Sequence, residues 1–162
     1  MNTCTKPIIV VGASGSCASK AALRWAADEA DRLGGRLIAV RAWEPSHPAY
    51  YAPHAEYRDR DHERQAVAAE LASTLRAVFG AEPPPDLLTE VSEGMPERVL
   101  ADRSAGADLL VLGSTSAPTV VGRSIGPVIR SCLSRAHCPV VVIGPEGTAA
   151  AHHHPEPAIS SS

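Results

Sequence analysis

Five short apolar segments, spaced along most of the chain, constrain its fold more than any other feature. They are residues 7–12 (PIIVVG), 36–43 (RLIAVRAW), 87–94 (LLTEVSEG), 108–113 (DLLVLG) and 139–144 (PVVVIG). Apolar runs of this length, several of them closed by glycine, are typical of strands that are buried on both faces of a parallel sheet. The run at 87–94 is more polar, so it is predicted to lie at a sheet edge.

Helical patterns occupy the stretches between these segments. After Ser19, five apolar residues fall on one helical face before a stop at Gly34, namely Ala22, Leu23, Ala26, Ala30 and Leu33. A loop is predicted at 44–60. The helix after it carries the stripe Val67, Leu71, Leu75 and Val78. Pro96 opens a short third helix, and a fourth is predicted over 126–136. Strands that alternate with helices predict an open α/β domain, with a parallel sheet and helices on both faces.

The predicted strand order brings two loops together. Because crossovers are right-handed, the expected order is 3-2-1-4-5, with the first and fourth strands adjacent. The winding of the chain reverses between these two strands, and ligands of such sheets bind at that reversal, outside the strand ends. The loops that follow them are 12–16 (GASGS) and 113–127 (GSTSAPTVVGRSIGP), both rich in glycine and serine. The sequence therefore predicts a ligand site between these loops.

Composition narrows the class of partner. The 162 residues carry a net charge of −3 and only 4% aromatic residues, so neither nucleic acid nor an anionic membrane surface is an expected partner. No apolar run approaches the length of a membrane span, and the start of the chain does not resemble a signal peptide. The four cysteines lack CxxC spacing and are expected to be free thiols. Together these features predict a cytoplasmic protein.

The chain is predicted to have two parts, a folded domain over 1–145 and a disordered tail over 146–162. The tail has no apolar period, which is typical of disorder. Its three adjacent histidines, His152, His153 and His154, are interpreted as solvated side chains rather than as a metal site. No metal is expected beyond the magnesium that accompanies a nucleotide.

No catalytic motif is complete in either loop. Neither loop has the GxxxxGK[ST] pattern of a P-loop, and no GxGxxG follows the first strand. The stretch GASGS resembles a nucleophile elbow around Ser14, but Ser16 stands where the GxSxG pattern has glycine. The base of an acyl-transfer triad would have to be His137, and no pattern brings it to Ser14. An enzyme is therefore not predicted, and a slow ATPase or a serine hydrolase at Ser14 is the alternative.

Taken together, the segments resemble the universal stress protein family. The matching pieces follow the order and spacing of that family over about residues 6–145: IIVVGASGS, AALRWAADEA, RLIAVRAW, VSEGMPERVL, AGADLLVLGS and SRAHCPVVVI. The resemblance implies the fold predicted above and a homodimer that pairs the last strands, here 139–143. It also implies a stress-linked regulatory role through a protein partner that the sequence does not name.

The resemblance implies where an adenine nucleotide, ATP or AMP, would lie. Ala42 and Leu112 would flank the base, and Gly12 and Ala13 would allow its close approach. Ser14 replaces an aspartate that faces the nucleoside in members that bind ATP. The residues placed at the nucleotide in this way are Gly12, Ala13, Ser14, Ala42, Leu112, Gly113, Ser114, Ser116, Gly122, Arg123, Gly126, Pro127 and Val128.

The phosphate end departs from the pattern of those members. They carry Gly-x-x-Gly, nine residues and then Gly-Ser/Thr, whereas this chain has Gly113-x-x-Ser116, nine residues and then Gly126-Pro127. Pro127 supplies neither an N–H nor a hydroxyl, and Ile129 stands where a further hydroxyl is common. Each lost donor to phosphate would cost roughly 1.5–3 kcal/mol, so two or three losses would weaken binding by about a hundredfold or more.

Two functions follow from these changes. The leading hypothesis is a dimeric stress-response regulator with a degenerate nucleotide site, in which ATP binding is weak or absent. The alternative is a functional binder of ATP, or of a smaller ligand such as AMP or cyclic AMP that needs fewer phosphate donors. Pro127 is also a good first residue for a helix, so its presence is compatible with both.

Overall fold

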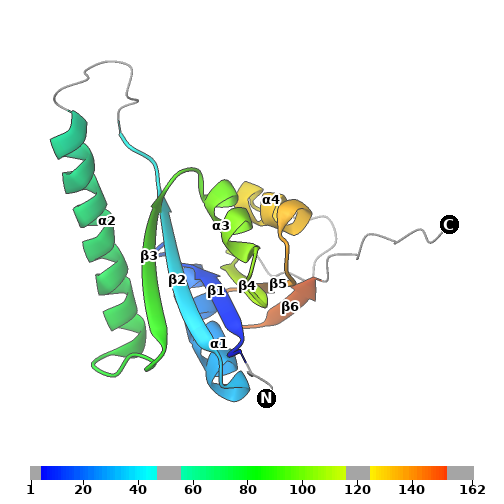
Figure 1. Cartoon of the computed structure of the whole chain (residues 1–162). Coiled ribbons are helices and arrows are strands. Elements are labelled where there is room, and N and C mark those ends of the chain that lie inside the picture. Colours follow the sequence, from blue (N-terminus) through cyan, green and yellow to red (C-terminus); the bar gives the residue numbers. More distant parts are fainter. Residues whose placement is uncertain (1–4, 47–55, 116–124, 153–162) are drawn as a thin grey trace.

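The computed structural model describes residues 5–46, 56–115 and 125–152, which build one sheet with helices on both sides (Figure 1). The strands are β1 (Ile8–Gly12), β2 (Arg36–Trp43), β3 (Leu87–Glu93), β4 (Leu109–Gly113), β5 (Val140–Ile143) and β6 (Ala149–His152). The helices are α1 (Cys17–Leu33), α2 (Glu56–Phe79), α3 (Pro96–Ser104) and α4 (Pro127–Arg135). The sheet order is β3-β2-β1-β4-β5-β6, with β1 to β5 parallel. The predicted fold class and strand order are confirmed.

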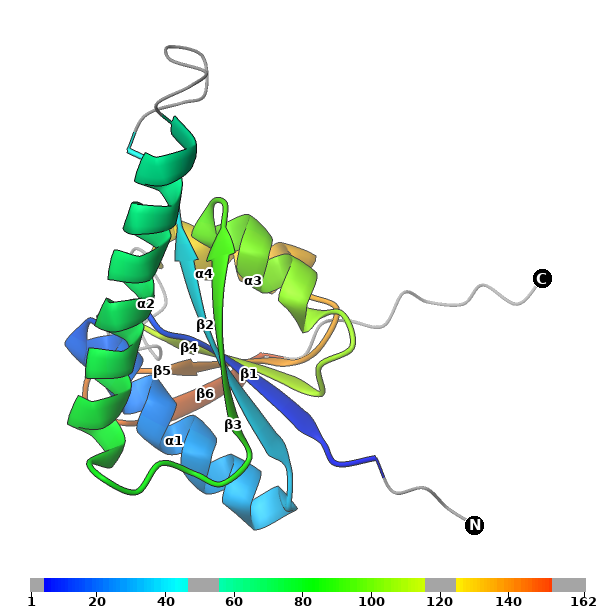
Figure 2. The same ribbon diagram turned by 60° about the vertical axis from the view of Figure 1, so that its left-hand side comes forward.

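The sheet separates two apolar clusters, so the core has two layers. Helices α1 and α2 cover one face, and α3 and α4 cover the other (Figure 2). Because side chains alternate along a strand, Ile9 and Val11 of β1 belong to the first cluster and Val10 belongs to the second. All three are nearly inaccessible to solvent, which explains why the central strands read as unbroken apolar runs.

Helix α1 has the buried face and the ends that its sequence predicts. Ser16 caps its first turn by accepting a hydrogen bond from the Ser19 N–H, and Gly34 ends it in the left-handed conformation. Four of the five predicted residues are buried: Ala22, Leu23, Ala26 and Ala30. Leu33 is 42% exposed because it occupies the last turn, at the rim of the core.

Helix α2 is longer than predicted. It begins at Glu56, inside the loop expected at 44–60, and residues 47–55 lie outside the described part of the chain. The extra turns were missed because 56–66 is mostly charged and polar and carries no apolar stripe. Farther along the helix, Leu71 and Leu75 are buried as predicted.

Strand β6 differs from what the sequence predicts for the end of the chain. The segment 146–162 was predicted to be disordered, but its residues 149–152 pair antiparallel with β5. Gly147 makes the turn possible, because its φ of +75° is readily adopted only by glycine, and the Gly144 N–H donates to the Thr148 carbonyl at 2.9 Å. β5 is consequently not a free edge on which a second copy could pair directly. Residues 153–162, including His153 and His154, lie outside the described range.

Gly113, at the end of β4, is where α1 and the sheet approach most tightly. A Cβ at this position would lie 2.7 Å from the Ser19 nitrogen and closer still to the Ala18 carbonyl. Both neighbours are backbone atoms of the first turn of α1, so no side chain can move aside. Glycine is required here for packing, whatever role the loop has toward a ligand.

We expect Gly113→Ala to lower the free energy of unfolding by roughly 1–3 kcal/mol or more, because the methyl group would push α1 away from β4. Urea denaturation followed by circular dichroism measures this change. Gly126→Ala is the matched control, since a Cβ there meets nothing within 4 Å, and its expected cost is about 1 kcal/mol or less. Equal stability of the two variants would contradict the packing role of Gly113.

Candidate functional site

A cavity of about 400 Å³ opens at the carboxyl end of β1 and β4, where the winding of the sheet reverses. Its volume is within the range of small-molecule sites, and its walls are mostly apolar. The described residues that line it are Gly12, Ala13, Ser14, Ser19, Val40, Arg41, Ala42, Pro96, Leu100, Leu112, Gly113, Val128 and Ile129. The topology thus brings the two predicted loops to one cavity.

Many of the polar groups of the first loop, residues 12–16, have hydrogen-bond partners in the loop itself or in the elements next to it. The Ala13 N–H donates to the Val40 carbonyl at 2.9 Å, which holds the loop against β2. The Gly15 N–H donates to Ser19 Oγ at 3.0 Å. Ser14 Oγ and Ser16 Oγ share a hydrogen bond of 3.0 Å. The serines of this loop therefore cap the helix and brace the turn.

Arg41 is a site residue that the sequence analysis missed. It lines the cavity, and its Nη1 donates to the carbonyls of Ser14 and of Ala13, the latter at 3.4 Å. Its Nη2 lies 3.2 Å from Oε2 of Glu70 on α2. The available signal was a single cation inside the otherwise apolar end of the segment RLIAVRAW, directly before Ala42.

The second loop is described at its two ends. Gly113 lines the cavity, and the Ser114 N–H donates to the Ile143 carbonyl at 2.8 Å. At the other end, Gly126 is the N-cap of α4 and Pro127 is its first residue, so the predicted helix start is confirmed. The predicted site residues Ser116, Gly122 and Arg123 lie outside the described residues.

Most of the predicted site residues that the structure describes line the cavity. These are Gly12, Ala13, Ser14, Ala42, Leu112, Gly113 and Val128. Three others, Ser114, Gly126 and Pro127, flank it without lining it. The lining residues Pro96 and Leu100 were missed because only the packing of α3 over the sheet brings them to this edge.

The first turn of α4 lies beside the cavity, at the place where an anion site was expected. The amide groups at a helix start normally point toward an anion, but Pro127 has no N–H to offer. Ile129 is only 7% exposed and lines the cavity, so an apolar side chain occupies the position where a hydroxyl was expected in nucleotide-binding members. Of the two positions at which the sequence predicts a missing phosphate donor, Ile129 therefore lines the cavity and Pro127 begins the helix two residues earlier.

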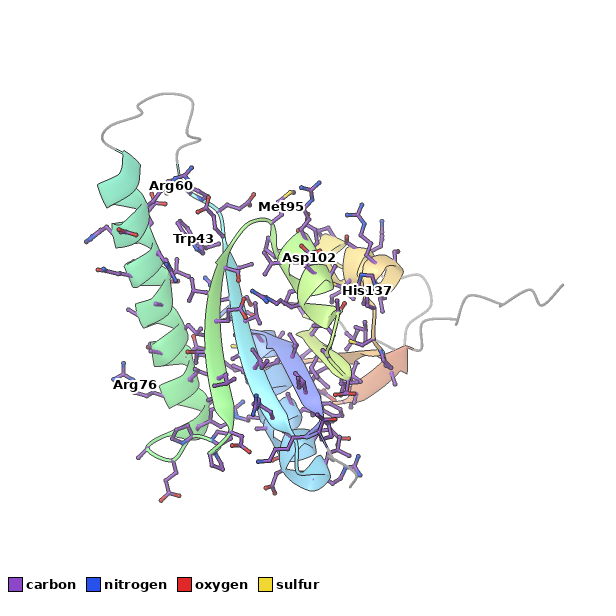
Figure 3. All side chains as sticks on the ribbon, in the orientation of Figure 1. Trp43, Arg60, Arg76, Met95, Asp102 and His137 are labelled. Carbon is purple, nitrogen blue, oxygen red and sulfur yellow. The ribbon has the colours of Figure 1, made fainter. Side chains whose placement is uncertain are left out.

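The candidate triad members Ser14 and His137 lie at opposite ends of the parallel strands. Ser14 follows the carboxyl end of β1, whereas His137 precedes β5 and lies on the α3–α4 side (Figure 3). The His137 N–H donates to Ser104 Oγ at 2.8 Å. Asp108, at the same amino end of the strands, accepts from the Ile8 N–H at 2.7 Å, which gives it a structural role. In the described part of the chain, no cluster of three metal-ligating side chains is present.

The fold and this cavity define an open, doubly wound α/β domain with a small-molecule crevice at its switch point. The family model "Universal stress protein family" matches residues 7–144. The chain belongs to the universal stress protein family. Among the helices of the described residues, none has the length and apolar character needed to cross a membrane.

Curated relatives support the same assignment. Universal stress protein Rv2623 of Mycobacterium tuberculosis is 30% identical over 155 residues, which is 93% of this chain and 52% of the relative. Universal stress protein Rv2005c of the same organism is 34% identical over 136 residues, which is 83% of this chain and 44% of the relative. The chain thus spans about half the length of these relatives.

Solved structures have the same fold. The universal stress protein UspA from Lactobacillus plantarum superposes with a TM-score of 0.66 at 26% identity, covering 87% of this chain and 99% of that one. A universal stress protein crystallised in complex with cAMP superposes with a TM-score of 0.56 at 22% identity, covering 86% of this chain and 98% of that one. The bound cAMP was observed in that second protein.

The described cysteines differ sharply in environment. Cys17 is exposed at the start of α1, beside the first loop, whereas Cys132 and Cys138 are buried under α3 and α4. Burial raises the pKa of the Cys132 thiol to about 11, and the Glu97 carboxylate adds to the effect. Burial also raises the pKa of Cys138 to about 11, with a further contribution from Asp108.

We expect iodoacetamide at pH 8 to modify Cys17 and to leave Cys132 and Cys138 intact in the folded protein. The thiolate is the reactive form, and at about three pH units below the pKa its share of a buried thiol is about one in a thousand. Peptide mapping by mass spectrometry gives the modified positions. The urea-unfolded protein is the control, in which all three should react, and equal labelling of the three in the folded protein would contradict the burial.

Proposed function

We propose that this universal stress protein is a stress-linked regulatory domain whose cavity binds the adenosine part of a nucleotide and holds a polyphosphate weakly. AMP or cyclic AMP is then the preferred ligand, and ATP binds weakly or not at all. The observation that carries the proposal is an open, apolar cavity beside a helix start that has lost phosphate donors. The proposed role is regulation through ligand and partner binding, without a catalytic step.

The base end of the cavity supports this proposal. Val40 and Ala42 of β2, together with Leu112 of β4 and Leu100 of α3, give apolar walls of the kind that hold a flat aromatic ring. Gly12 leaves room for a ligand to approach the backbone at this end of the cavity. A Cβ at this position would take up that space, 3.3 Å from the side chains of Leu100 and Leu112. None of the described residues that line the cavity has an aromatic side chain that would fill it.

The phosphate end supports weak binding of ATP. A triphosphate needs several N–H or hydroxyl donors, and helix starts commonly supply them. In α4, Pro127 removes one backbone donor, and the buried side chain of Ile129 brings apolar surface to the cavity wall. A single or cyclic phosphate needs fewer of these donors, so its binding is less affected.

Full ATP binding is the second candidate. Helix geometry leaves the amides of the first turn without intrahelical partners, so Val128 and Ile129 still carry N–H groups beside the cavity. Gly126 also leaves open space at the N-cap, where a Cβ would meet nothing within 4 Å. These features favour an anion at the start of α4 in spite of Pro127.

We propose in addition that the chain forms a homodimer, and that β6 rather than β5 is the strand at which the two copies meet. β6 pairs with β5 along the predicted contact segment, so the outermost strand at this end of the described sheet is β6. A second copy would then pair with β6. Strand edges with unpaired backbone groups favour such contacts.

Calorimetric titration of the nucleotide-stripped protein with AMP, cyclic AMP and Mg-ATP tests the proposal. We expect AMP or cyclic AMP to bind at least about tenfold more tightly than ATP, which corresponds to the loss of one charged hydrogen bond. Ala42→Leu, which adds bulk to the cavity wall, should abolish binding and locate the site. ATP binding as tight as AMP binding would favour the second candidate, and silence with all three ligands would overturn the nucleotide proposal.

The double variant Pro127→Ser/Ile129→Ser should recover ATP binding. It restores a backbone N–H and two hydroxyls at the start of α4, so the ATP affinity is expected to rise by about tenfold to a hundredfold while the AMP affinity changes little. Ile125→Ser is the matched control, because Ile125 is 43% exposed and does not line the cavity. An unchanged ATP affinity in the double variant would show that these two positions do not limit phosphate binding.

A further inference from the structure

Arg41 is a charged residue in an unusual position. Its side chain is 23% exposed, and its Nε is buried without a hydrogen-bond partner. Removing part of a guanidinium from water is unfavourable unless the remaining donors find strong acceptors. Here those acceptors are the carbonyls of Ala13 and Ser14 and the carboxylate of Glu70. Arg41 therefore connects three segments: β2, the first loop and α2.

The first loop has two sides. One side lines the cavity through Gly12, Ala13 and Ser14. The other side approaches α2, since a Cβ on Gly15 would lie 3.5 Å from Oγ1 of Thr74. A movement of α2 relative to β2 therefore reaches the cavity wall through this loop.

The same surface of α2 faces both Arg41 and the first loop. Glu70 and Thr74 are four residues apart and so lie on one side of the helix. Thr74 Oγ1 also donates to the Glu70 carbonyl at 3.0 Å, which ties the two positions together. Trp43, two residues after Arg41 on the same side of β2, points toward α2 (Figure 3).

The carbonyls of Ala13 and Ser14 accept hydrogen bonds from Arg41, whereas the internal hydrogen bonds of the loop involve other groups. The bonds among Ser14, Ser16 and Ser19 hold hydroxyls and the helix cap. The Ser14 carbonyl accepts from the guanidinium of Arg41, directly before the turn at Gly15, whose φ is +87°. Glycine in such a turn adopts several backbone conformations, so an outside contact is needed to select one.

We propose that Arg41 is a positioning residue that sets the first loop in its ligand-binding geometry by bridging its carbonyls to Glu70 of α2. The inference rests on the proposed function, because the loop is one wall of the proposed nucleotide cavity. Glu70 is 65% exposed, and exposed ion pairs contribute little stability. The contribution of the pair is the orientation of the guanidinium, whose planar fork reaches two acceptors at once in a way that lysine does not.

Titration with AMP separates this role from simple stabilisation. Arg41→Gln should weaken AMP binding about tenfold, and Arg41→Lys should recover part of the loss. The charge-swapped Arg41→Glu/Glu70→Arg restores the ion pair, but it places a carboxylate against the loop carbonyls. Its AMP affinity should stay as low as that of Arg41→Gln. Arg36→Gln, which removes an exposed cation at the other end of β2, is the matched control and should bind like the wild type.

Amide hydrogen exchange by nuclear magnetic resonance gives a readout that does not need a ligand. Arg41→Gln should speed exchange at Gly15 and Ser16 and leave the β1 amides of Val10 and Val11 unchanged. Loop exchange like that of the wild type, or full recovery of AMP affinity in the charge swap, would overturn the inference. A wild-type protein that binds no adenine nucleotide would overturn the proposed function instead. The exchange rates would still test the role of Arg41, because they are measured without a ligand.

Discussion

The contact between Gly113 and the first turn of α1 is the constraint on which the candidate site depends. β1 and β4 lie side by side at the centre of the sheet, and both end in loops that must diverge around the start of α1. Only a residue without a side chain at 113 lets α1 sit against the sheet at this distance. The position of α1 then fixes Ser16 and Ser19, which brace the first loop. The cavity is the space left between that loop and α3 and α4.

The cavity is built of parts with different physical character. Its walls on the side of β2 and α3 are apolar, and they derive from the second core cluster of the fold. Its other end meets the start of α4, where Pro127 has no N–H and the side chain of Ile129 is buried. Arg41 adds one cation near the first loop, but its Nη1 and Nη2 already donate to two carbonyls and to Glu70.

The far end of the sheet shows how a short polar tail can change an interaction surface. β5 consists of four buried apolar residues, and such a strand would tend to pair with a strand of another chain if its edge were open. β6 fills this edge with alanines and a histidine, through a turn that depends on Gly147. It contributes backbone pairing more than apolar burial, because Ala149 and Ala151 are exposed. In the described sheet, β6 therefore covers the edge of β5 that the sequence predicted to be free for pairing.

The sequence by itself determined the α/β class, the order of the five parallel strands and the meeting of the two loops. These follow from local periodicity and from the handedness of crossovers, which act the same way in any chain of this pattern. It also placed Ala42 and Leu112 at the cavity through the family resemblance. Tertiary structure alone decided the pairing of β6, the arrival of Leu100 at the cavity and the bridge from Arg41 to Glu70. Those features depend on which distant segments come into contact, and residue type and spacing do not record such contacts.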